Sequence, residues 1–320
     1  MNLHYSIDDV QKIAEVLQDA ERGAFQHLKI LTSDAPEEQN RPTRLNVMAA
    51  LNNWLSGAKP EDTVLFFFSG HGATDDKNRN YLLPVDVQAD LLEDTAIPMR
   101  RINEILNDRD HIAAQKVIVV LDSCHSGAKV GQKAFSVEGK ILDPLFTETE
   151  GRITFASCGR DEIVYEEETL GHGVFSYYLA DGLQGGGDRN GDGYIEADEL
   201  FTYVADSVRN WAKQRGYQQT PRKQDNVTGS ILIGYHPGNL AQSQRDTSQA
   251  EFDTYRQKLR SLLDLDVAEL AAAEKLLERE MKGELLTDFE REWLALIRNL
   301  ADGEISLKIY WLAKRGAASD

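Results

Sequence analysis

The sequence predicts an α/β protein, a three-layer sandwich with a mostly parallel central sheet, followed by a small C-terminal helical region. Three observations lead to this class. Up to about residue 235, short runs of Val, Ile, Leu and Phe alternate with amphipathic stretches of helical period. The runs are apolar without interruption, which is typical of strands that are covered on both faces. The 320 residues are enough for one large α/β domain and an appendage.

The predicted elements of the first domain, residues 1–236, alternate along the chain. The strands are expected in HLKILTS from His27, TVLFFFS ending at Ser69, KVIVVLD ending at Asp122, RITFAS ending at Ser157 and SILIG from Ser230. The helices are expected near residues 7–22, 44–57, 99–108, 173–183 and 197–214. Because helices separate the strands, most neighbouring strands should run parallel.

The composition changes near residue 236. The segment 237–249 is polar and carries Pro and Gly, which predicts a linker. Beyond it, the region 250–320 is expected to form helices at 250–263, 267–282 and 288–301. Their amphipathic pattern is typical of a packed module, which binds a protein partner, regulates the first domain or serves structural packing alone.

Charge and cysteine content exclude several classes of protein. The chain has 35 Lys and Arg against 53 Asp and Glu, a net charge of −18, which argues against nucleic acid or an anionic membrane surface as a partner. Two cysteines, Cys124 and Cys158, cannot build a disulfide framework, and their scarcity favours a reducing compartment. The sequence shows no signal peptide and no run of 18 apolar residues, so we expect a cytoplasmic protein without membrane association.

The strongest chemical signal is a histidine and a cysteine that each follow a predicted strand. His71 lies in VLFFFSGHGA, and Cys124 lies in VIVVLDSCHSGA. The carboxyl ends of parallel strands share one edge of a sheet, so both side chains should meet there as a Cys-His dyad, with the N–H groups of Gly72 and Cys124 as an oxyanion hole. The alternative is a buried cysteine and an ordinary loop histidine. Three more residues of these types are expected to be structural: His125, Cys158 and His172.

These motifs resemble a known family. The run SGHG after one apolar strand and DSCHSG after the next, with YLLPVD, FASCGRDEIVYEE, GHGVFSYYLADGL and QTPR, are similar to the caspase-like cysteine peptidases. The Asp-Ser-Cys form resembles metacaspases and their prokaryotic relatives, the orthocaspases. Over residues 3–235, the resemblance implies a caspase-like fold with His71 and Cys124 as the catalytic pair.

The resemblance also implies a substrate class. The segment LHYSIDDV places an acidic pocket residue at Asp9, and Asp122 and Ser69 match further residues of the same pocket. Two carboxylates hold a guanidinium by charge-assisted hydrogen bonds, so we expect cleavage of proteins after Arg or Lys and not after Asp. Alternatively, Asp9 caps the first helix and Asp122 orders the loop around Cys124.

A further motif predicts calcium binding. Residues 188–199, DRNGDGYIEADE, match the twelve-residue EF-hand loop, in which oxygen ligands surround Ca²⁺ and a glycine at the sixth position allows a sharp turn. The alternative is a solvated acidic turn that caps a helix. The expected ligands are Asp188, Asn190, Asp192, Tyr194 through its carbonyl, Glu196 and Glu199.

The usual calcium cluster of metacaspases is only partly matched. Asp86, Glu93 and Asp94 resemble parts of it, but SGAKVG, from Ser126, replaces the aspartate expected after the nucleophile. The EF-hand loop is therefore expected to take over calcium sensing.

Two departures concern the organisation of the chain. The buried strand that opens caspase-like domains has no counterpart before LHYSIDDV, and the apolar segment 305–313 is one candidate to replace it. The stretch after the nucleophile carries Lys129, Lys133 and Lys140, where self-processing would occur unless the stretch is an ordinary surface loop.

Taken together, the motifs predict a calcium-responsive cysteine endopeptidase that acts on protein substrates. The alternative is a catalytically weak, calcium-switched protein that uses the caspase-like fold as a binding module or scaffold.

Overall fold

A computed structural model describes residues 4–77, 79–124, 151–159 and 162–240. Beyond them it describes residues 250, 254, 257–258, 267–281 and 288–301. The chain divides into two compact units, Met1–Pro237 and Gly238–Asp320. Each unit has buried apolar residues of its own.

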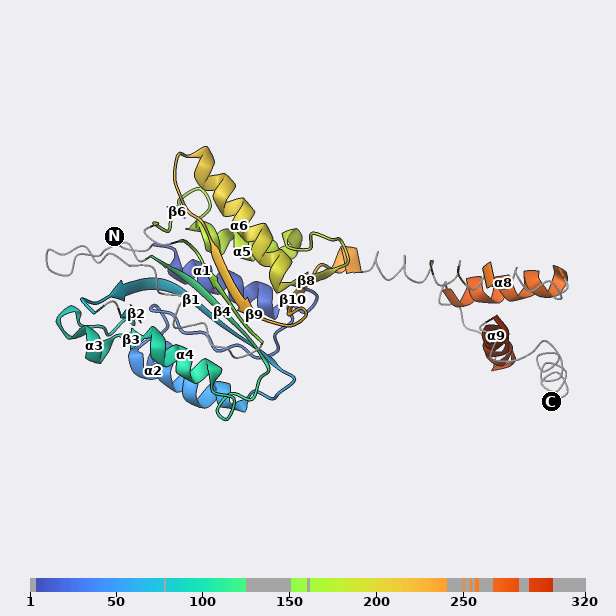
Figure 1. Cartoon of the computed structure of the whole chain (residues 1–320), viewed down its shortest axis with the longest axis horizontal. Coiled ribbons are helices and arrows are strands. Elements are labelled where there is room, and N and C mark those ends of the chain that lie inside the picture. The colour runs from blue at the N-terminus through green and yellow to red at the C-terminus, as the bar shows by residue number, and fades with distance from the viewer. Residues whose placement is uncertain are drawn as a thin grey trace. The chain divides into compact units, whose positions relative to one another are not determined.

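Six strands form the central sheet of the first unit, in the order β3-β2-β1-β4-β5-β9 (Figure 1). The three central strands run parallel, and the three outer ones are antiparallel to their neighbours. This arrangement confirms the predicted α/β class. The strands are β1 (Thr63–Thr74), β2 (Asn80–Leu82), β3 (Ile97–Pro98), β4 (Lys116–Cys124), β5 (Arg152–Ala156) and β9 (Arg222–Asn226).

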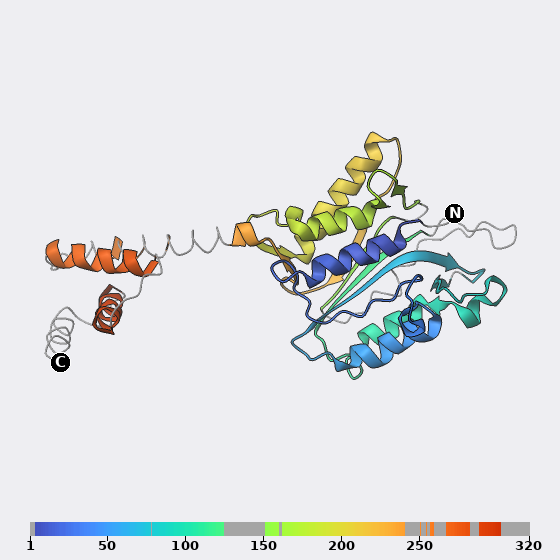
Figure 2. The same ribbon diagram turned by 180° about the vertical axis from the view of Figure 1, so that it is seen from behind.

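Helices cover both faces of the sheet and complete the three layers (Figures 1 and 2). One face carries α1 (Ser6–Gln18), α5 (Val174–Asp181) and α6 (Ala197–Gln214). The other face carries α2 (Arg44–Ala49) and α4 (Met99–Asn107).

Smaller elements connect these layers. Strands β6 and β7 pair antiparallel, and so do β8 and β10, each pair forming a small sheet of its own. The remaining short elements of the first unit are η1 (Glu38–Asn40), η2 (Ala50–Trp54), η3 (Leu55–Gly57), η4 (Ala89–Leu91), α3 (Leu92–Thr95), β6 (Glu166–Glu167), β7 (His172–Gly173), η6 (Gly182–Gly186), β8 (Tyr194–Glu196) and β10 (Leu232–Tyr235).

The central strands are buried on both faces. In β4, Ile118 and Val120 pack into the core beneath α1, α5 and α6, whereas Val117 and Val119 pack into the core on the α4 side. This two-sided burial is the reason why these strands appear in the sequence as uninterrupted apolar runs.

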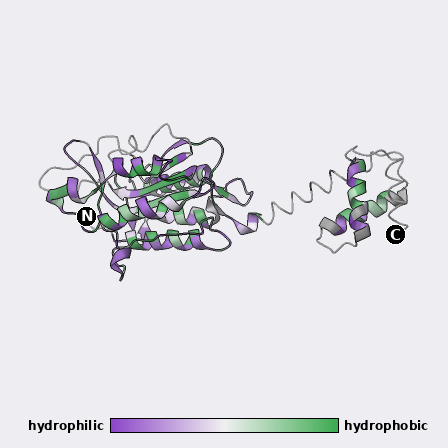
Figure 3. Cartoon of the chain, turned by 90° about the horizontal axis from the view of Figure 1, so that it is seen from below, coloured by the Kyte–Doolittle hydropathy of each residue, from purple (hydrophilic) through white to green (hydrophobic). Residues whose placement is uncertain are grey.

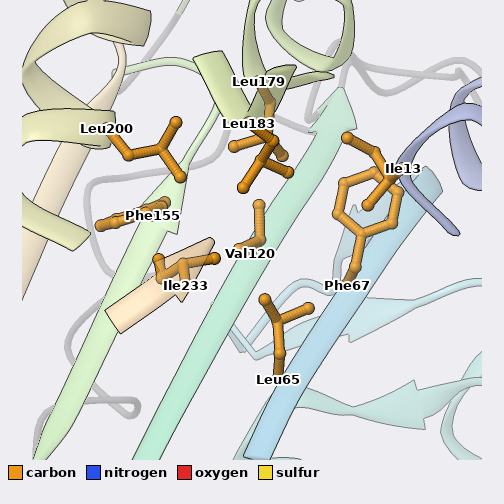
Figure 4. Close-up of a pocket in the computed structure, with 9 residues that line it drawn as sticks. All are labelled: Ile13, Leu65, Phe67, Val120, Phe155, Leu179, Leu183, Leu200 and Ile233. Carbon is orange, nitrogen blue, oxygen red and sulfur yellow. The ribbon is translucent and has the colours of Figure 1, made fainter. Parts of the chain in front are cut away.

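The core between the sheet and helices α1, α5 and α6 holds a small apolar cavity (Figure 4). Its lining exposes no polar surface, so it is a packing gap and offers no group for recognition or catalysis. The lining residues are Ile13, Leu65, Phe67, Val120, Phe155, Leu179, Leu183, Leu200 and Ile233.

Two of the five predicted strands differ from the prediction, and the short strands β2, β3, β6, β7 and β8 and the five-residue strand β9 were not predicted. Residues 27–33 are not a strand, because their backbone has no ladder partner among the described residues and Thr32 N donates instead to Asn40 O in a loop. The run from Ser230 forms β10, which pairs with β8 outside the central sheet. The longest missed strand, β9, is polar because it lies at the exposed edge of the sheet.

The edge of β1 opposite β4 is open over most of its length. Strand β2 pairs only with Gly72–Thr74, and no described strand pairs with residues 63–70 on that side. Among the described residues, no strand occupies the position that an opening strand would take beside β1. The segment 305–313, the candidate to replace that strand, lies outside the described residues, as do Lys129, Lys133 and Lys140.

The second unit contains two described helices, α8 (Val267–Met281) and α9 (Asp288–Ala301), at the positions predicted for the last two helices. Figure 3 shows hydrophilic and hydrophobic residues interspersed along the helices of the chain. The remaining predicted helix, 250–263, which precedes these two in the chain, falls mostly outside the described residues. None of the helices that the structure describes is long and apolar enough to span a membrane. The buried side chains of α8 and α9 are Ala273, Leu276, Leu277, Leu294, Ile297 and Leu300.

Candidate active site

The candidate catalytic residues lie at the carboxyl ends of β1 and β4. These two strands pair in parallel, and their register places His71 directly beside Cys124. The His71 ring is partly buried, and this burial lowers its pKa below the ordinary value of 6.5, although Glu166 acts in the opposite direction. A lowered pKa keeps the imidazole neutral near pH 7, which is the form that can accept a proton.

Gly72 extends the same strand end. Leu83 N donates to His71 O, so the odd-numbered backbone groups of β1 face the side of β2. By alternation, the N–H of Gly72 points to the side on which β4 and Cys124 lie. This is the direction that the expected oxyanion hole requires.

Two buried carboxylates, Asp9 and Asp122, lie close together next to these strand ends, and they are called the acidic pocket below after the role that the sequence predicts for them. Asp9 on α1 is 2% exposed and Asp122 on β4 is 4% exposed. A Cβ added to Gly173 would lie 3.0 Å from Asp9 Oδ2 and 3.2 Å from Asp122 Oδ2, so both carboxylates converge on this glycine. Ser69 Oγ donates to Asp9 Oδ2 at 3.2 Å. The structure thus brings together the three expected pocket residues, Asp9, Ser69 and Asp122.

The hydrogen bonds of standard geometry in the pocket leave one oxygen without a described partner. Asp9 Oδ1 accepts from Gly173 N at 3.1 Å, and Asp122 Oδ2 accepts from Ser176 Oγ at 2.5 Å. Asp122 Oδ1 is buried and makes no hydrogen bond of standard geometry to a described residue, although the Ser157 hydroxyl and the Ser176 N–H lie near enough to this carboxyl group to lower its pKa. A buried carboxylate oxygen of this kind is costly unless a ligand pairs with it.

Burial makes both carboxyl groups poor acids in the absence of a cation. It raises the pKa of Asp9 to about 8, with Asp122 as the second cause, and it also raises the pKa of Asp122. A guanidinium or ammonium group placed between them would favour the ionised forms. The pocket is therefore chemically suited to a cationic side chain.

The structure does not support the alternative role of Asp9 as a helix cap. The residue before α1 is Tyr5, and the N-terminus of this helix has no side-chain cap. The Asp9 carboxylate is directed to β7 and Ser69 instead.

The loop 188–199 adopts the turns that its sequence predicts. Asp188 accepts from the N–H groups of Gly191 and Gly193, and Asp192 accepts from that of Tyr194. Asn190 accepts from the N–H of Asp192.

Glu199 closes this loop. Its carboxylate accepts from Arg189 N and Glu196 N, and the latter bond belongs to a capping box at the start of α6. Side-chain oxygens of the first, third, fifth and twelfth loop positions thus turn toward backbone N–H groups of the loop. Among the described residues, no three His, Cys, Asp or Glu side chains converge closely enough to form a metal site.

Asp86 and Glu93, two of the three residues that resemble the usual calcium cluster, have other partners. Asp86 accepts from Arg44 N at the start of α2, and Glu93 pairs with Lys77 and Arg79. These contacts tie the segment around β2 together and do not assemble a second acidic site.

One residue of the pocket was missed by the sequence analysis. His172, expected to be a turn or helix-start residue, lies on β7 with its Nδ1 2.9 Å from Asp9 Oδ1. No local pattern reveals this contact, because 163 residues separate the two side chains. Cys158 is partly buried, as its expected structural role requires, and its Sγ lies 3.8 Å from Glu162 O. His125 lies outside the described residues.

Comparison with known proteins gives a family match and several relatives. The family model for the caspase domain matches residues 1–231. Metacaspase-1 of Pyricularia oryzae is 26% identical over 161 residues, which cover 45% of this chain and 38% of that protein. Metacaspase-1 of Cryptococcus neoformans var. neoformans serotype D is 28% identical over 149 residues, or 43% of this chain and 32% of that protein. The chain thus spans about a third of the length of these two relatives.

Solved structures are also similar. Caspase-1 from Spodoptera frugiperda has a TM-score of 0.46 and 12% sequence identity, over 74% of this chain and 84% of that one.

Proposed function

The chain belongs to the caspase-domain family of cysteine peptidases, and from this premise we propose that it is a metacaspase-type endopeptidase that cleaves proteins after Arg or Lys. Cys124 is the nucleophile, and His71 is the acid–base residue. The observation that carries the proposal is the pair of buried carboxylates, Asp9 and Asp122, that converge on Gly173. Buried charges of one sign need a partner of the other sign, and a basic substrate side chain supplies it.

The proposed reaction follows from the positions at the strand ends. His71 takes the proton of the Cys124 thiol, and the thiolate attacks the carbonyl carbon of the scissile bond. The N–H groups of Gly72 and Cys124 donate to the resulting oxyanion. The C–N bond then breaks, and His71 returns the proton to the leaving amine. Water, activated by His71, hydrolyses the thioester and releases the second product.

The proposed specificity follows from the oxygens of the pocket. Asp122 Oδ1 and Asp9 Oδ2 are the acceptors for an arginine guanidinium, whose planar fork suits two carboxylates. A lysine ammonium offers a point charge and should bind less well. An aspartate side chain would add a third buried negative charge, so it should be rejected.

We propose calcium regulation through the loop 188–199. The donors expected there, carboxylate, amide and carbonyl oxygens, are the hard ligands that Ca²⁺ prefers. Asp188, Asn190, Asp192 and Glu199 would hold the ion with their side chains, together with Tyr194 through its carbonyl and Glu196. Bound Ca²⁺ would supply positive charge that replaces the internal hydrogen bonds of these oxygens. The loop would then hold β8 and the start of α6 more firmly.

The position of this loop gives it a route to the pocket. Helix α5 begins directly after Gly173, the glycine between the two carboxylates, and continues through η6 to Gly186. Asp188, the first loop residue, follows two residues later. EF-hand loops usually pair with a second loop, but here β10 pairs with the loop strand β8. Ordering of the loop would therefore act on the far end of the helix that borders the pocket.

Peptides that differ at one position test the peptidase. Fluorogenic peptides with Arg, Lys or Asp before the cleaved bond should be turned over in that order, with the Asp peptide untouched. Cys124→Ala should abolish turnover. Asp9→Asn should lower kcat/KM for the Arg peptide by roughly 100-fold or more, since breaking a buried charge pair costs about 3–5 kcal/mol. Turnover of the Asp peptide alone would contradict the proposed specificity.

Calcium titration tests the regulation. Isothermal calorimetry should detect Ca²⁺ binding to the wild type, and the double variant Asp188→Ala with Glu199→Gln should lose it. Glu93→Gln is the matched control, because Glu93 belongs to the partial metacaspase cluster and should not affect binding. Turnover of the Arg peptide should fall on chelation in the wild type and in Glu93→Gln, but not in the double variant. Unchanged binding in the double variant would refute the role of the loop.

Two finer expectations complete the proposal. A working thiolate requires a reducing compartment, which supports a cytoplasmic location. The unit that contains α8 and α9 is the candidate surface for a protein partner, and size-exclusion chromatography with light scattering would detect self-association of the chain.

A further inference from the structure

His172 contacts the acidic pocket from β7. Its Nδ1 lies 2.9 Å from Asp9 Oδ1, and its side chain is 20% exposed. The next residue, Gly173, donates its N–H to the same oxygen at 3.1 Å. Both contacts come from one two-residue strand, so β7 holds one oxygen of the Asp9 carboxylate from two directions.

The two oxygens of Asp9 have different environments. Oδ1 is held by β7, whereas Oδ2 accepts from Ser69 and is directed toward the place where Asp122 Oδ2 also converges. Because His172 engages Oδ1, it fixes the carboxylate rotation that turns Oδ2 to the pocket. Without the imidazole, Gly173 N alone would restrain that rotation from this side.

The contact also bears on the charge of Asp9. Hydrogen bonds from Gly173 N and Ser69 favour the ionised form of Asp9 and oppose the effects of burial and of Asp122. Burial lowers the pKa of His172, which favours the neutral ring, and the tautomer with its proton on Nδ1 can donate to Asp9 Oδ1 in the same sense. Other groups around the imidazole include Asp8 and Lys12 of α1 and the ring of Tyr177 on α5. Glu166 of β6 acts on Asp9 as well.

We propose that His172 is a positioning residue of the specificity pocket, which favours the ionised form of the Asp9 carboxyl group and directs it at the basic side chain of the substrate. It does not touch the reacting atoms, so it acts on substrate binding and leaves the chemical step nearly unchanged. This inference rests on the proposed function, because it assigns a role within the same pocket.

Three variants distinguish an effect of the hydrogen bond between His172 and Asp9 from a general loss of stability. His172→Asn keeps a donor at the position of Nδ1 but cannot titrate. His172→Gln is its matched control, because its amide lies one bond farther out and misses Asp9 Oδ1. His172→Leu removes the donor altogether. Each is compared with the wild type by circular dichroism and by its melting temperature.

Steady-state kinetics with the Arg peptide give the decisive readout. We expect His172→Leu and His172→Gln to raise KM about tenfold with kcat changed less than about twofold, and to move the acid limb of kcat/KM to higher pH by about one unit. His172→Asn should stay within about threefold of the wild type, with its acid limb in place. If the Leu variant does not fold, the comparison of Asn with Gln decides in the same way.

Two outcomes would overturn the inference, and they are distinguishable. A wild type that prefers Arg, with Leu or Gln variants that are folded and kinetically unchanged, refutes the role of His172 and leaves the proposed function intact. A wild type without any preference for Arg over Asp refutes both.

Discussion

Gly173 illustrates how a single residue type defines the pocket. Its φ of −60° is open to any L-residue, so the backbone does not require glycine. The neighbouring atoms do require glycine, because an added Cβ would lie 3.0 Å from Asp9 Oδ2 and 3.2 Å from Asp122 Oδ2. The space beside Gly173 is therefore limited by the two carboxyl groups, and a larger residue would displace them.

Gly173→Ala should fill that space and displace the two carboxyl groups. We expect KM for the Arg peptide to rise at least about tenfold and the melting temperature to fall by a few degrees, roughly the effect of 1 kcal/mol, because the added Cβ presses on buried side chains. Gly57→Ala is the control, since a Cβ there meets nothing within 4 Å and the variant should match the wild type in both measurements. Equal KM values for the Gly173 variant and the wild type would show that the substrate does not use this space.

The ionisation of Asp9 predicts a dependence of stability on pH. Its pKa is raised from 3.8 to about 8, chiefly by burial. Between about pH 4 and about pH 8 the folded chain holds a proton that the unfolded chain has lost, so Asp9 makes the free energy of unfolding fall as pH rises through this window. Asp9→Asn has no such proton, and it should exceed the wild type in stability by about 1–3 kcal/mol near pH 7.5.

Urea unfolding of this variant and the wild type at about pH 5 and about pH 7.5 checks the sign. The stability advantage of Asp9→Asn should shrink at the lower pH, where the wild-type carboxyl group is protonated in the folded state. An advantage that is the same at both values, or larger at the lower one, would contradict the raised pKa.

The sequence predicted one set of pocket residues and missed another for a physical reason. Asp122 lies two residues before the candidate nucleophile, and Asp9 lies in a recognisable segment, so local patterns were sufficient. His172 contacts Asp9 only because β7 pairs with β6 and α5 packs against α1. Such long-range pairing leaves no periodic or spacing signal in the chain.

At the scale of elements, the errors concern strands whose surroundings differ from those of the core. The buried β4 and β5 were predicted from apolar runs because both of their faces are covered. The run 27–33 is apolar at only three of its seven positions and has no ladder partner among the described residues, whereas the polar β9 forms a strand because β5 offers it an edge. Strand formation depends on a neighbour as well as on side chains.

The open edge of β1 predicts an alternating pattern of hydrogen exchange. The N–H groups of Leu65 and Phe67 face this edge, whereas those of Phe66 and Phe68 face β4. Amide exchange measured by NMR should therefore be fast at the first pair and slow at the second. Equal protection of both pairs would mean that the edge is covered by a chain segment outside the described residues or by another molecule.

At the scale of the whole molecule, the charge of −18 agrees with the chemistry of the pocket. A negative electrostatic field attracts basic peptides at long range, and salt weakens this attraction. It would therefore raise the rate at which substrate and protein meet, whereas the two carboxylates would bind the basic side chain after the encounter. The acidic loop 188–199 contributes to that field, and Ca²⁺ would neutralise part of it if it binds there as proposed.

The division into two units predicts that the first unit functions without the second. Both core clusters that flank the central sheet, the acidic pocket and the loop 188–199 lie within Met1–Pro237. A fragment of residues 1–240 should therefore unfold cooperatively, keep kcat/KM for the Arg peptide within about twofold of the full chain, and keep its response to Ca²⁺. Kinetic assays and thermal melts of the fragment beside the full chain measure this.

Loss of folding or activity in that fragment would have a specific meaning. It would show that the first unit needs residues 241–320 for folding or activity. A strand from those residues could pair with the edge of β1 that has no strand partner among the described residues. Hydrogen exchange then separates the explanations. Leu65 and Phe67 protected in the full chain but not in the fragment would place a segment such as 305–313 on that edge. Fast exchange in both would assign the loss to another cause and leave β1 open.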